Sequence, residues 1–246
     1  MTAVKADSTC WPDMAAAIER SGIAILPIGA VEQHGAHLPL ATDTILASGI
    51  AESIAGQLDA ILLPAISFGE AWTNADFTGT LSLSPETLRA IVRDLGREWH
   101  RVGGRALIVM NGHFGNSAPI SLAARDLLTE LKLPVLNLDY PNLAELADHI
   151  CHSKPAAPGF YHADEVETSM MLVFAPEKVD MDRAAPEYPE FPASFGYEHI
   201  QLREFNSTGV FGDPRPATAE KGQKLIDGIV ANAMDVIAAF KTRNGV

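Results

Sequence analysis

Short apolar runs alternate with longer amphipathic stretches along most of this chain. Each apolar run is bounded by Gly, Pro or Asn, and four of them are predicted to form strands, at residues 23–28, 60–66, 106–110 and 134–138. Short continuous apolar runs are typical of parallel strands buried on both faces, and the stretches between them are typical of crossover helices. We therefore expect an α/β fold built around a mostly parallel sheet.

The amphipathic stretches predict the helices of this fold. One helix has a well-marked start, because Ser84 can cap it, Pro85 suits the first helical position and Glu86 favours the positive end of the helix dipole. The expected helices cover residues 13–20, 43–58, 85–102, 117–131, 165–174 and 217–240. A chain of 246 residues without internal repeats is expected to form one domain, residues 1–246.

The charge and the cysteine content limit which binding partners and which cellular compartment we expect for this protein. The formal net charge is -13 and the 18 basic residues form no run, so neither nucleic acid nor an anionic membrane is expected as a partner. Only Cys10 and Cys151 are present, which fits a reducing compartment. The stretch 1–10 lacks the layout of a signal peptide, and no apolar stretch approaches the ~20 residues that span a bilayer. We expect a cytoplasmic protein.

Residue types that bind metal ions are concentrated directly after the first predicted strand. Glu32, His34, His37 and Asp43 lie in one short segment there. Side chains two residues apart on an extended segment point the same way, so Glu32 and His34 can share a face. After a short bend, the chain can bring Asp43 back to the same place. Such a set suits a divalent ion such as Zn, Mn or Fe. Each residue alone fits a polar surface loop better, whereas the set favours a metal site.

His113 is a further candidate ligand. It follows the predicted strand 106–110 in a turn that contains glycines, and ligands of doubly wound sheets collect beyond the carboxyl ends of the strands. A lone His in such a turn is more often a structural hydrogen-bonding residue, but here it converges with the first segment on one sheet edge. Asn116 and His37 could orient ligands, or could equally form structural hydrogen bonds in turns.

A group of polar residues lies just before and within the first turn of the predicted helix 165–174. It consists of His162, Asp164, Glu165 and Glu167. The positive end of the helix dipole is an adequate explanation for Asp164 and Glu165. Further along, residues 182–211 lack periodicity and are expected to form a long irregular excursion. A surface wrap or subunit contact and an active-site lid are equally open as its role.

Five segments together resemble the signature of the creatininase (creatinine amidohydrolase) family. The first, residues 29–44, contains the sequence Glu-Gln-His-Gly-Ala-His-Leu-Pro. The others follow in the family's order at residues 77–83, 111–116, 162–169 and 209–222, so the resemblance spans roughly residues 20–240. It implies a three-layer α/β/α fold of the creatininase type and a homo-oligomer, most simply a hexamer.

The resemblance also implies a centre of two divalent ions, Zn, Mn or Fe, bridged by Asp43 and by a water. One ion would be held by Glu32, Asp43 and His113, and the other by His34, Asp43 and a further carboxylate. A hydroxide bridging the ions would attack the amide carbon of a small-molecule substrate, and His162 would carry the proton to the departing nitrogen.

Three departures from creatininase itself bear on this expectation. Creatininases carry Glu where this chain has Gly115, and we assign the missing role of ligand and catalytic group to Glu167. They close the pocket with tryptophans shortly before the position of His162, whereas the three tryptophans of this chain lie elsewhere. Relatives usually have His at the position of Asn74.

The expected function is metal-dependent hydrolysis of a C–N bond in a small cyclic amide, a formamide or a short peptide, and the expected class is an amidohydrolase acting on bonds other than peptide bonds. Creatinine is not the expected substrate, because the aromatic gate and the carboxylate at Gly115 are missing. The alternative is a non-catalytic sensor domain that binds a metal or small ligand on the same fold. Clustered N and O ligands beside a His favour the hydrolase, since a structural site normally closes its coordination.

Overall fold

The computed structural model describes residues 3–246 and contains a parallel sheet with the strand order β1-β3-β2-β4-β5. Every pair of neighbouring strands runs parallel. The strands are β1 (Val4–Lys5), β2 (Ile23–Ile28), β3 (Ile61–Leu62), β4 (Ala106–Asn111) and β5 (Val135–Leu138). Met1 and Thr2, which open the stretch considered above for a signal peptide, lie outside the described residues.

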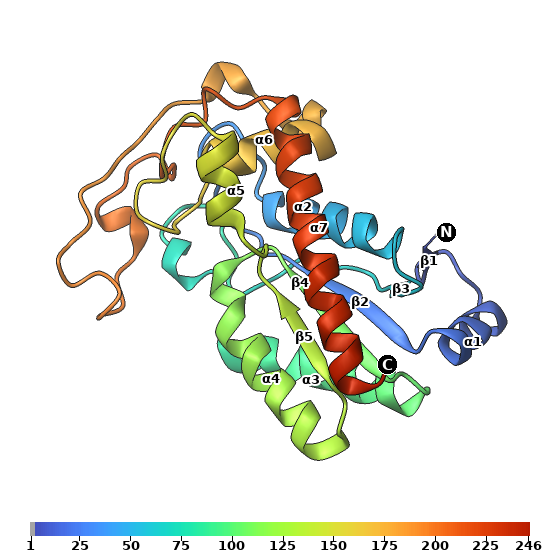
Figure 1. Cartoon of the computed structure of the whole chain (residues 1–246). Coiled ribbons are helices and arrows are strands. Elements are labelled where there is room, and N and C mark those ends of the chain that lie inside the picture. The colour runs from blue at the N-terminus through green and yellow to red at the C-terminus, as the bar shows by residue number, and fades with distance from the viewer. Residues whose placement is uncertain (1–2) are drawn as a thin grey trace.

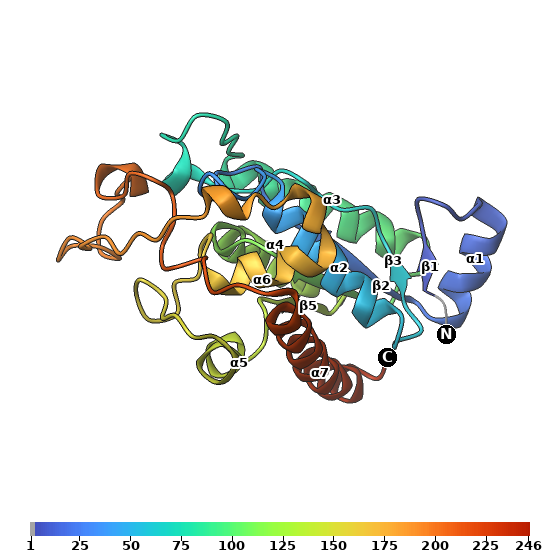
Figure 2. The ribbon, with the colours of Figure 1, turned by 90° about the horizontal axis from the view of Figure 1, so that it is seen from above.

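Helices cover both faces of the sheet (Figures 1 and 2). They are α1 (Trp11–Arg20), α2 (Thr42–Ala55), α3 (Pro85–Arg101), α4 (Ser117–Leu131), α5 (Leu143–Ile150), α6 (Glu165–Phe174) and α7 (Ala219–Asn244). One core holds side chains of α2, α5, α6 and α7, and the other holds those of α1, α3 and α4. The predicted three-layer α/β/α fold is therefore confirmed. Within residues 3–246, no helix is both long and apolar enough to cross a membrane.

The central strands show why their sequences are continuously apolar. All residues of β2 and β4 are buried. Ile23 and Ile25 of β2 pack into the core with α2, whereas Ala24 and Leu26 pack into the opposite core with α3 and α4. Because successive side chains of a strand point to opposite faces, a strand between two helix layers needs apolar residues at every position.

Two strands and two helices differ from the sequence prediction. β3 pairs only at Ile61–Leu62 instead of over 60–66, although Ile66 still bridges to Ile28. β1 and α5 were not predicted, because a two-residue strand has no detectable period and α5 is only eight residues long. The last helix runs to Asn244, past the predicted end at 240.

The excursion at 182–211 packs around a cluster of mainly aromatic side chains. This cluster consists of Phe77, Phe160, Phe191, Phe195, Phe205 and Phe211, together with Ala156 and Leu202. Phe211 is fully buried, and its N–H donates a hydrogen bond of 3.0 Å to the carbonyl of His162. The excursion therefore fixes the backbone of the segment that carries His162.

Candidate metal centre

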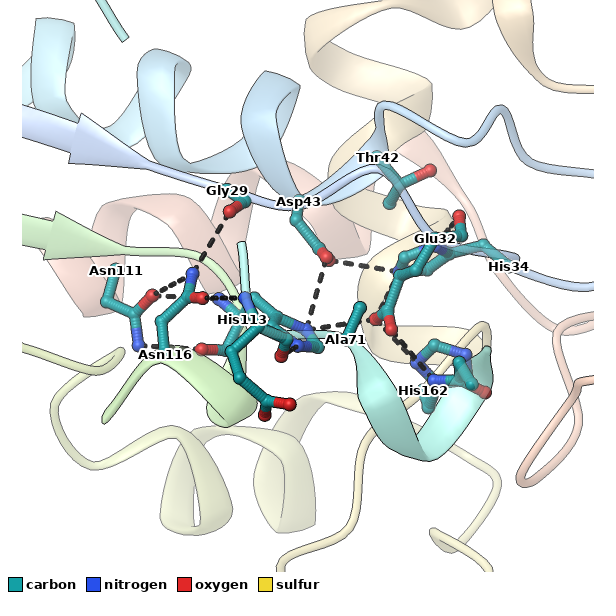
Figure 3. Close-up of polar contacts among 12 residues, drawn as sticks. Gly29, Glu32, His34, Thr42, Asp43, Ala71, Asn111, His113, Asn116 and His162 are labelled. Atoms are coloured by element: carbon teal, nitrogen blue, oxygen red, sulfur yellow. Dashed lines mark hydrogen bonds and ion pairs between the residues drawn. The ribbon is translucent and has the colours of Figure 1, made fainter. Parts of the chain in front are cut away.

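The candidate ligands gather beyond the carboxyl ends of β2 and β4 (Figure 3). Glu32 and His34 follow β2, and Asp43 lies in the first turn of α2. His113 follows β4, where the chain turns into a short 3₁₀ helix (Phe114–Asn116). His162 precedes α6 and Glu167 lies in its first turn, so segments far apart in the sequence supply one site.

These side chains form two groups that share Asp43. In the first, His113 Nδ1 lies 3.0 Å from Glu32 Oε1 and 3.3 Å from Asp43 Oδ2. In the second, His34 Nε2 lies 3.0 Å from Asp43 Oδ1 and 3.6 Å from Glu167 Oε2. The candidate ligand atoms of each group lie within 4.8 Å of one another, and Asp43 turns one oxygen toward each group.

The unsatisfied atoms of the site fit a metal ion. His34 Nε2 and Asp43 Oδ2 are buried and form no hydrogen bond of acceptable geometry. His34 Nδ1 lies 3.2 Å from the carbonyl oxygen of Glu32, and His113 Nε2 lies 2.7 Å from that of Glu70. Each of these ring nitrogens can donate its N–H to a carbonyl, which leaves the lone pair of the other nitrogen directed at the carboxylates. This orientation is the one that a metal-binding histidine needs.

The electrostatics of the site also call for a cation. Glu32, Asp43 and Glu167 are buried, and among the described residues every ion pair that they form is with a histidine. Burial works against a charged His34, but Asp43, Glu167 and Glu32 outweigh it and raise the pKa of His34 to about 10. Burial raises the pKa of Glu167 to about 8. Divalent ions would neutralise this concentration of carboxylates.

His162 lies at the same site with a different environment. Its Nδ1 is 3.7 Å from Glu32 Oε1, and its ring centroid is 4.5 Å from that of His34. Burial and the neighbouring His34 lower the pKa of His162 to about 3, so the ring is neutral. By distance alone, Glu32, His34 and His162 form a third possible ligand group. Distance therefore leaves His162 as either a ligand or a group that acts on the substrate.

Two further residues from the sequence prediction lie outside the three possible ligand groups. His37 belongs to none of the three possible ligand groups, and its Nε2 lies 2.9 Å from Thr168 Oγ1. Asn116 joins Gly29 and Glu70, because its Nδ2 donates to the Gly29 carbonyl at 3.0 Å and its Oδ1 accepts from the Glu70 N–H at 2.8 Å. Asn116 thereby holds the carbonyl of Glu70 in place for His113.

Sequence reasoning missed the contribution of two amides. Asn74 Nδ2 donates a hydrogen bond of 2.8 Å to Glu32 Oε2, and Gln33 Nε2 lies 2.8 Å from His162 Nε2. Gln33 stands between two candidate ligands, and strand alternation predicts that it points away from them. The only sequence signal for its role was its place within the 29–44 motif.

A pocket adjoins the candidate ligands. Beside Glu32, Asp43 and His113, its wall includes Tyr140 and Tyr161. The Tyr140 hydroxyl is buried without a hydrogen-bond partner, and the φ of this residue is 45°. Among the described residues that line the pocket, none is Lys or Arg. The pocket offers a small ligand aromatic walls and hydrogen-bonding groups, but no fixed side-chain cation.

Comparison with known proteins agrees with this geometry. The family model described as "Creatininase: Creatinine amidohydrolase" matches residues 7–237. The creatinine amidohydrolase of Pseudomonas putida is 28% identical over 229 residues, covering 87% of this chain and 88% of that protein. The mycofactocin precursor peptide peptidase of Mycobacterium ulcerans is 31% identical over 230 residues, covering 88% of this chain and 84% of that protein.

A solved structure gives the same result at the level of the fold. The crystal structure of a creatinine amidohydrolase (creatininase) superposes with a TM-score of 0.87 at 27% sequence identity, and the match covers 97% of this chain and 98% of that one. The sequence match spans most of the chain, and the structural match spans nearly all of it. This chain belongs to the creatininase family.

Proposed function

We propose that this chain is a metal-dependent amidohydrolase that cleaves a C–N bond in a small amide. The observation that carries the proposal is the pair of buried ligand groups that share Asp43, which line a pocket together with aromatic side chains. Membership of a family that includes a creatinine amidohydrolase and a peptide peptidase supports amide hydrolysis as the type of reaction.

We infer that the site takes two divalent ions, Zn, Mn or Fe. Glu32, Asp43 and His113 would hold one, and His34, Asp43 and Glu167 the other. Solved creatininases include a manganese form and a mutant of Zn–Zn type, which supports this choice of metals. When bound, such ions lower the pKa of a water molecule and polarise the amide carbonyl.

The chain's own residues would hold and orient the amide. His162 faces the ligand groups without being needed in either of them, so we assign it to the reacting amide. Glu167 would be fixed for its role by the Ala163 N–H, which donates a hydrogen bond of 2.6 Å to Glu167 Oε2. Glu167 thus supplies the carboxylate that is missing at position 115.

The substrate class follows from the wall of the pocket. The described lining residues include no Lys or Arg, which disfavours a substrate bearing phosphate, and the aromatic side chains suit a flat or apolar amide. We propose a small cyclic amide, a formamide or the end of a short peptide. Creatinine is disfavoured, because position 115 carries no carboxylate and no Trp lies among the described lining residues.

A hydrolysis screen tests this function. The protein, loaded separately with Zn, Mn and Fe, is offered creatinine, lactams, hydantoins, formamides and short peptides. We expect turnover of at least one amide, and turnover lowered by roughly 10²–10⁴-fold in metal-loaded His162→Ala, a matched control that keeps the ligand groups. Metal-loaded protein that hydrolyses none of these compounds would contradict the proposal and favour the sensor. Creatinine turnover at ~10⁴ M⁻¹s⁻¹ or more would contradict the substrate assignment alone.

A further inference from the structure

We propose that Gln33 is a positioning residue that holds the ring of His162 in one tautomer, with the proton on Nδ1, so that His162 is a hydrogen-bond donor to the substrate and not a metal ligand. The statement that His162 contacts a substrate rests on the proposed function. The tautomer itself follows from hydrogen bonds of the chain that are independent of any reaction.

The orientation of the Gln33 amide is fixed by a backbone group. The N–H of Gly35 donates a hydrogen bond of 3.0 Å to Gln33 Oε1. A backbone N–H can only donate, so the atom that faces it must be the amide oxygen. The NH₂ group of Gln33 therefore lies on the opposite side, toward Asn74 and His162.

The orientation of Asn74 is fixed in the same way by a carboxylate. Asn74 Nδ2 donates to Glu32 Oε2 at 2.8 Å, so Asn74 Oδ1 points the other way and accepts from Gln33 Nε2 at 2.9 Å. This contact uses one of the two N–H groups of Gln33. A reversed Gln33 amide would set two oxygens against each other and two N–H groups against each other.

The second N–H of Gln33 determines the state of His162. Gln33 Nε2 lies 2.8 Å from His162 Nε2, and both side chains are buried. An amide NH₂ has no lone pair to offer, so His162 Nε2 must accept the hydrogen bond and carries no proton. A neutral imidazole then bears its proton on Nδ1, which is the nitrogen that faces Glu32.

This tautomer decides between the two roles that distance left open. A ring nitrogen that carries a proton has no lone pair for a metal ion, so the group of Glu32, His34 and His162 does not hold one. It also revises the proton-carrier expectation, because no ring nitrogen is free to accept a proton. His162 would donate a hydrogen bond to the amide, and the proton that leaves the attacking water would reach the departing nitrogen through a group other than His162.

The fold encloses Gln33 tightly on its remaining side. A Cβ atom at Gly209 would lie 1.7 Å from Gln33 Oε1, and the φ of Gly209 is 80°, which disfavours any other residue. Gly209 belongs to the last segment of the family motif. Its replacement offers a way to displace the Gln33 amide without introducing a charge.

Solid-state NMR of the zinc-loaded chain, labelled with ¹⁵N-histidine, tests the proposal. Comparison with His162→Ala assigns the signals of His162. We expect a protonated Nδ1 and a bare Nε2 in the wild-type chain. In Gln33→Glu the carboxylate can only accept a hydrogen bond from the ring, so Nε2 becomes the protonated nitrogen that donates it. The matched control Gln57→Glu makes the same change at an exposed position and leaves the His162 signals unchanged.

The wild-type spectrum alone decides the proposal if Gln33→Glu does not fold. A bare Nδ1 in the wild-type chain, or one bound to zinc, would overturn it. Gly209→Ala gives a second test, with loss of the single-tautomer signal as the expected result. In an activity assay, Gln33→Glu should lower kcat about 10²-fold at unchanged metal content. A failed hydrolysis screen would refute the proposed function and leave the spectrum as evidence on the tautomer.

Discussion

Asp43 is the side chain on which both ligand groups depend. Its oxygens lie 3.0 Å from His34 Nε2 and 3.3 Å from His113 Nδ1. We therefore expect Asp43→Ala to lose both ions, whereas Glu32→Ala weakens mainly the ion shared with His113. Metal analysis of purified protein checks this. The control is Asp59→Ala, which removes an acid in an exposed pair with Arg20. An ion count in Asp43→Ala equal to that of the control would contradict a shared ligand.

Gly115 explains why this site cannot accept the carboxylate found in creatininases. A Cβ atom there would lie 2.0 Å from the Glu70 carbonyl oxygen and 2.6 Å from His113 Nε2. Gly115→Ala should push these two partners apart and weaken metal binding about 10- to 100-fold, the usual effect of losing a residue that orients a ligand.

Metal affinity of the Gly115→Ala variant, measured by competition with a chelator, tests this expectation. Gly56→Ala is the matched control, because a Cβ at Gly56 meets no atom nearer than 3.5 Å. Equal affinities for the two variants would show that the contact between His113 and Glu70 does not matter to the metal.

At the site, the sequence indicated which residue types gather, but not the hydrogen bonds between side chains that are far apart in the chain. Glu32, His34 and Asp43 lie close together in the chain, so their chemistry and spacing were enough to indicate a cluster. The contact of Gln33 with Asn74 joins residues 41 positions apart and depends on how a loop folds over the sheet edge. No periodicity encodes such a contact.

At the level of elements, a buried acid ties the segment before α6 to α7. Glu165 accepts hydrogen bonds from the backbone of His152 and Ser153 and from the Ser153 hydroxyl, and it pairs with Lys221 of α7. Burial would raise the pKa of Glu165, but Lys221 and the Ser153 groups outweigh it and lower the pKa below 4.5. This cluster anchors the segment that leads to His162.

Glu165→Gln should lower the free energy of unfolding by about 1–3 kcal/mol at neutral pH, because buried donors lose a charged acceptor. A carboxyl whose pKa is lowered by folding stabilises the fold above its unfolded pKa, and this contribution is lost as the pH falls through the folded pKa. The variant should therefore lose less stability than the wild type on acidification below about pH 4.5.

Urea unfolding at several pH values measures both effects. The matched control is Glu220→Gln, which removes a mostly exposed carboxylate that pairs with Lys224. Identical unfolding curves for the two variants would exclude a stabilising role for the Glu165 cluster.

The elements that the sequence predicted most closely are those that packing constrains on every side. β2 and β4 were predicted to within one residue because all their side chains are buried. β3 was predicted too long, since Leu62 is followed by a stretch that continues beside β2 with only the isolated bridge at Ile66. An apolar run shows that a segment is buried, but not how many of its backbone groups pair.

For the whole molecule, we propose a closed homo-oligomer, most simply a hexamer, on the basis of family membership. The chain is 47% hydrophobic, and several large apolar side chains remain exposed, including Phe68, Leu81 and Phe114. Burial of such side chains between subunits would stabilise an assembly. Light scattering at micromolar concentration should give a mass that is a multiple of 26.3 kDa. A monomeric mass would contradict the proposal.

The central claim is that two divalent ions at a shared Asp43 enable this chain to hydrolyse an amide. Its most direct test is a titration of metal-free protein with Zn or Mn, in which bound ions and hydrolysis of the best amide from the screen are measured together. The account predicts saturation at two ions per chain, with hydrolysis absent from the metal-free protein and greatest at saturation. Saturation at a single ion, with no hydrolysis at any point of the titration, would contradict it.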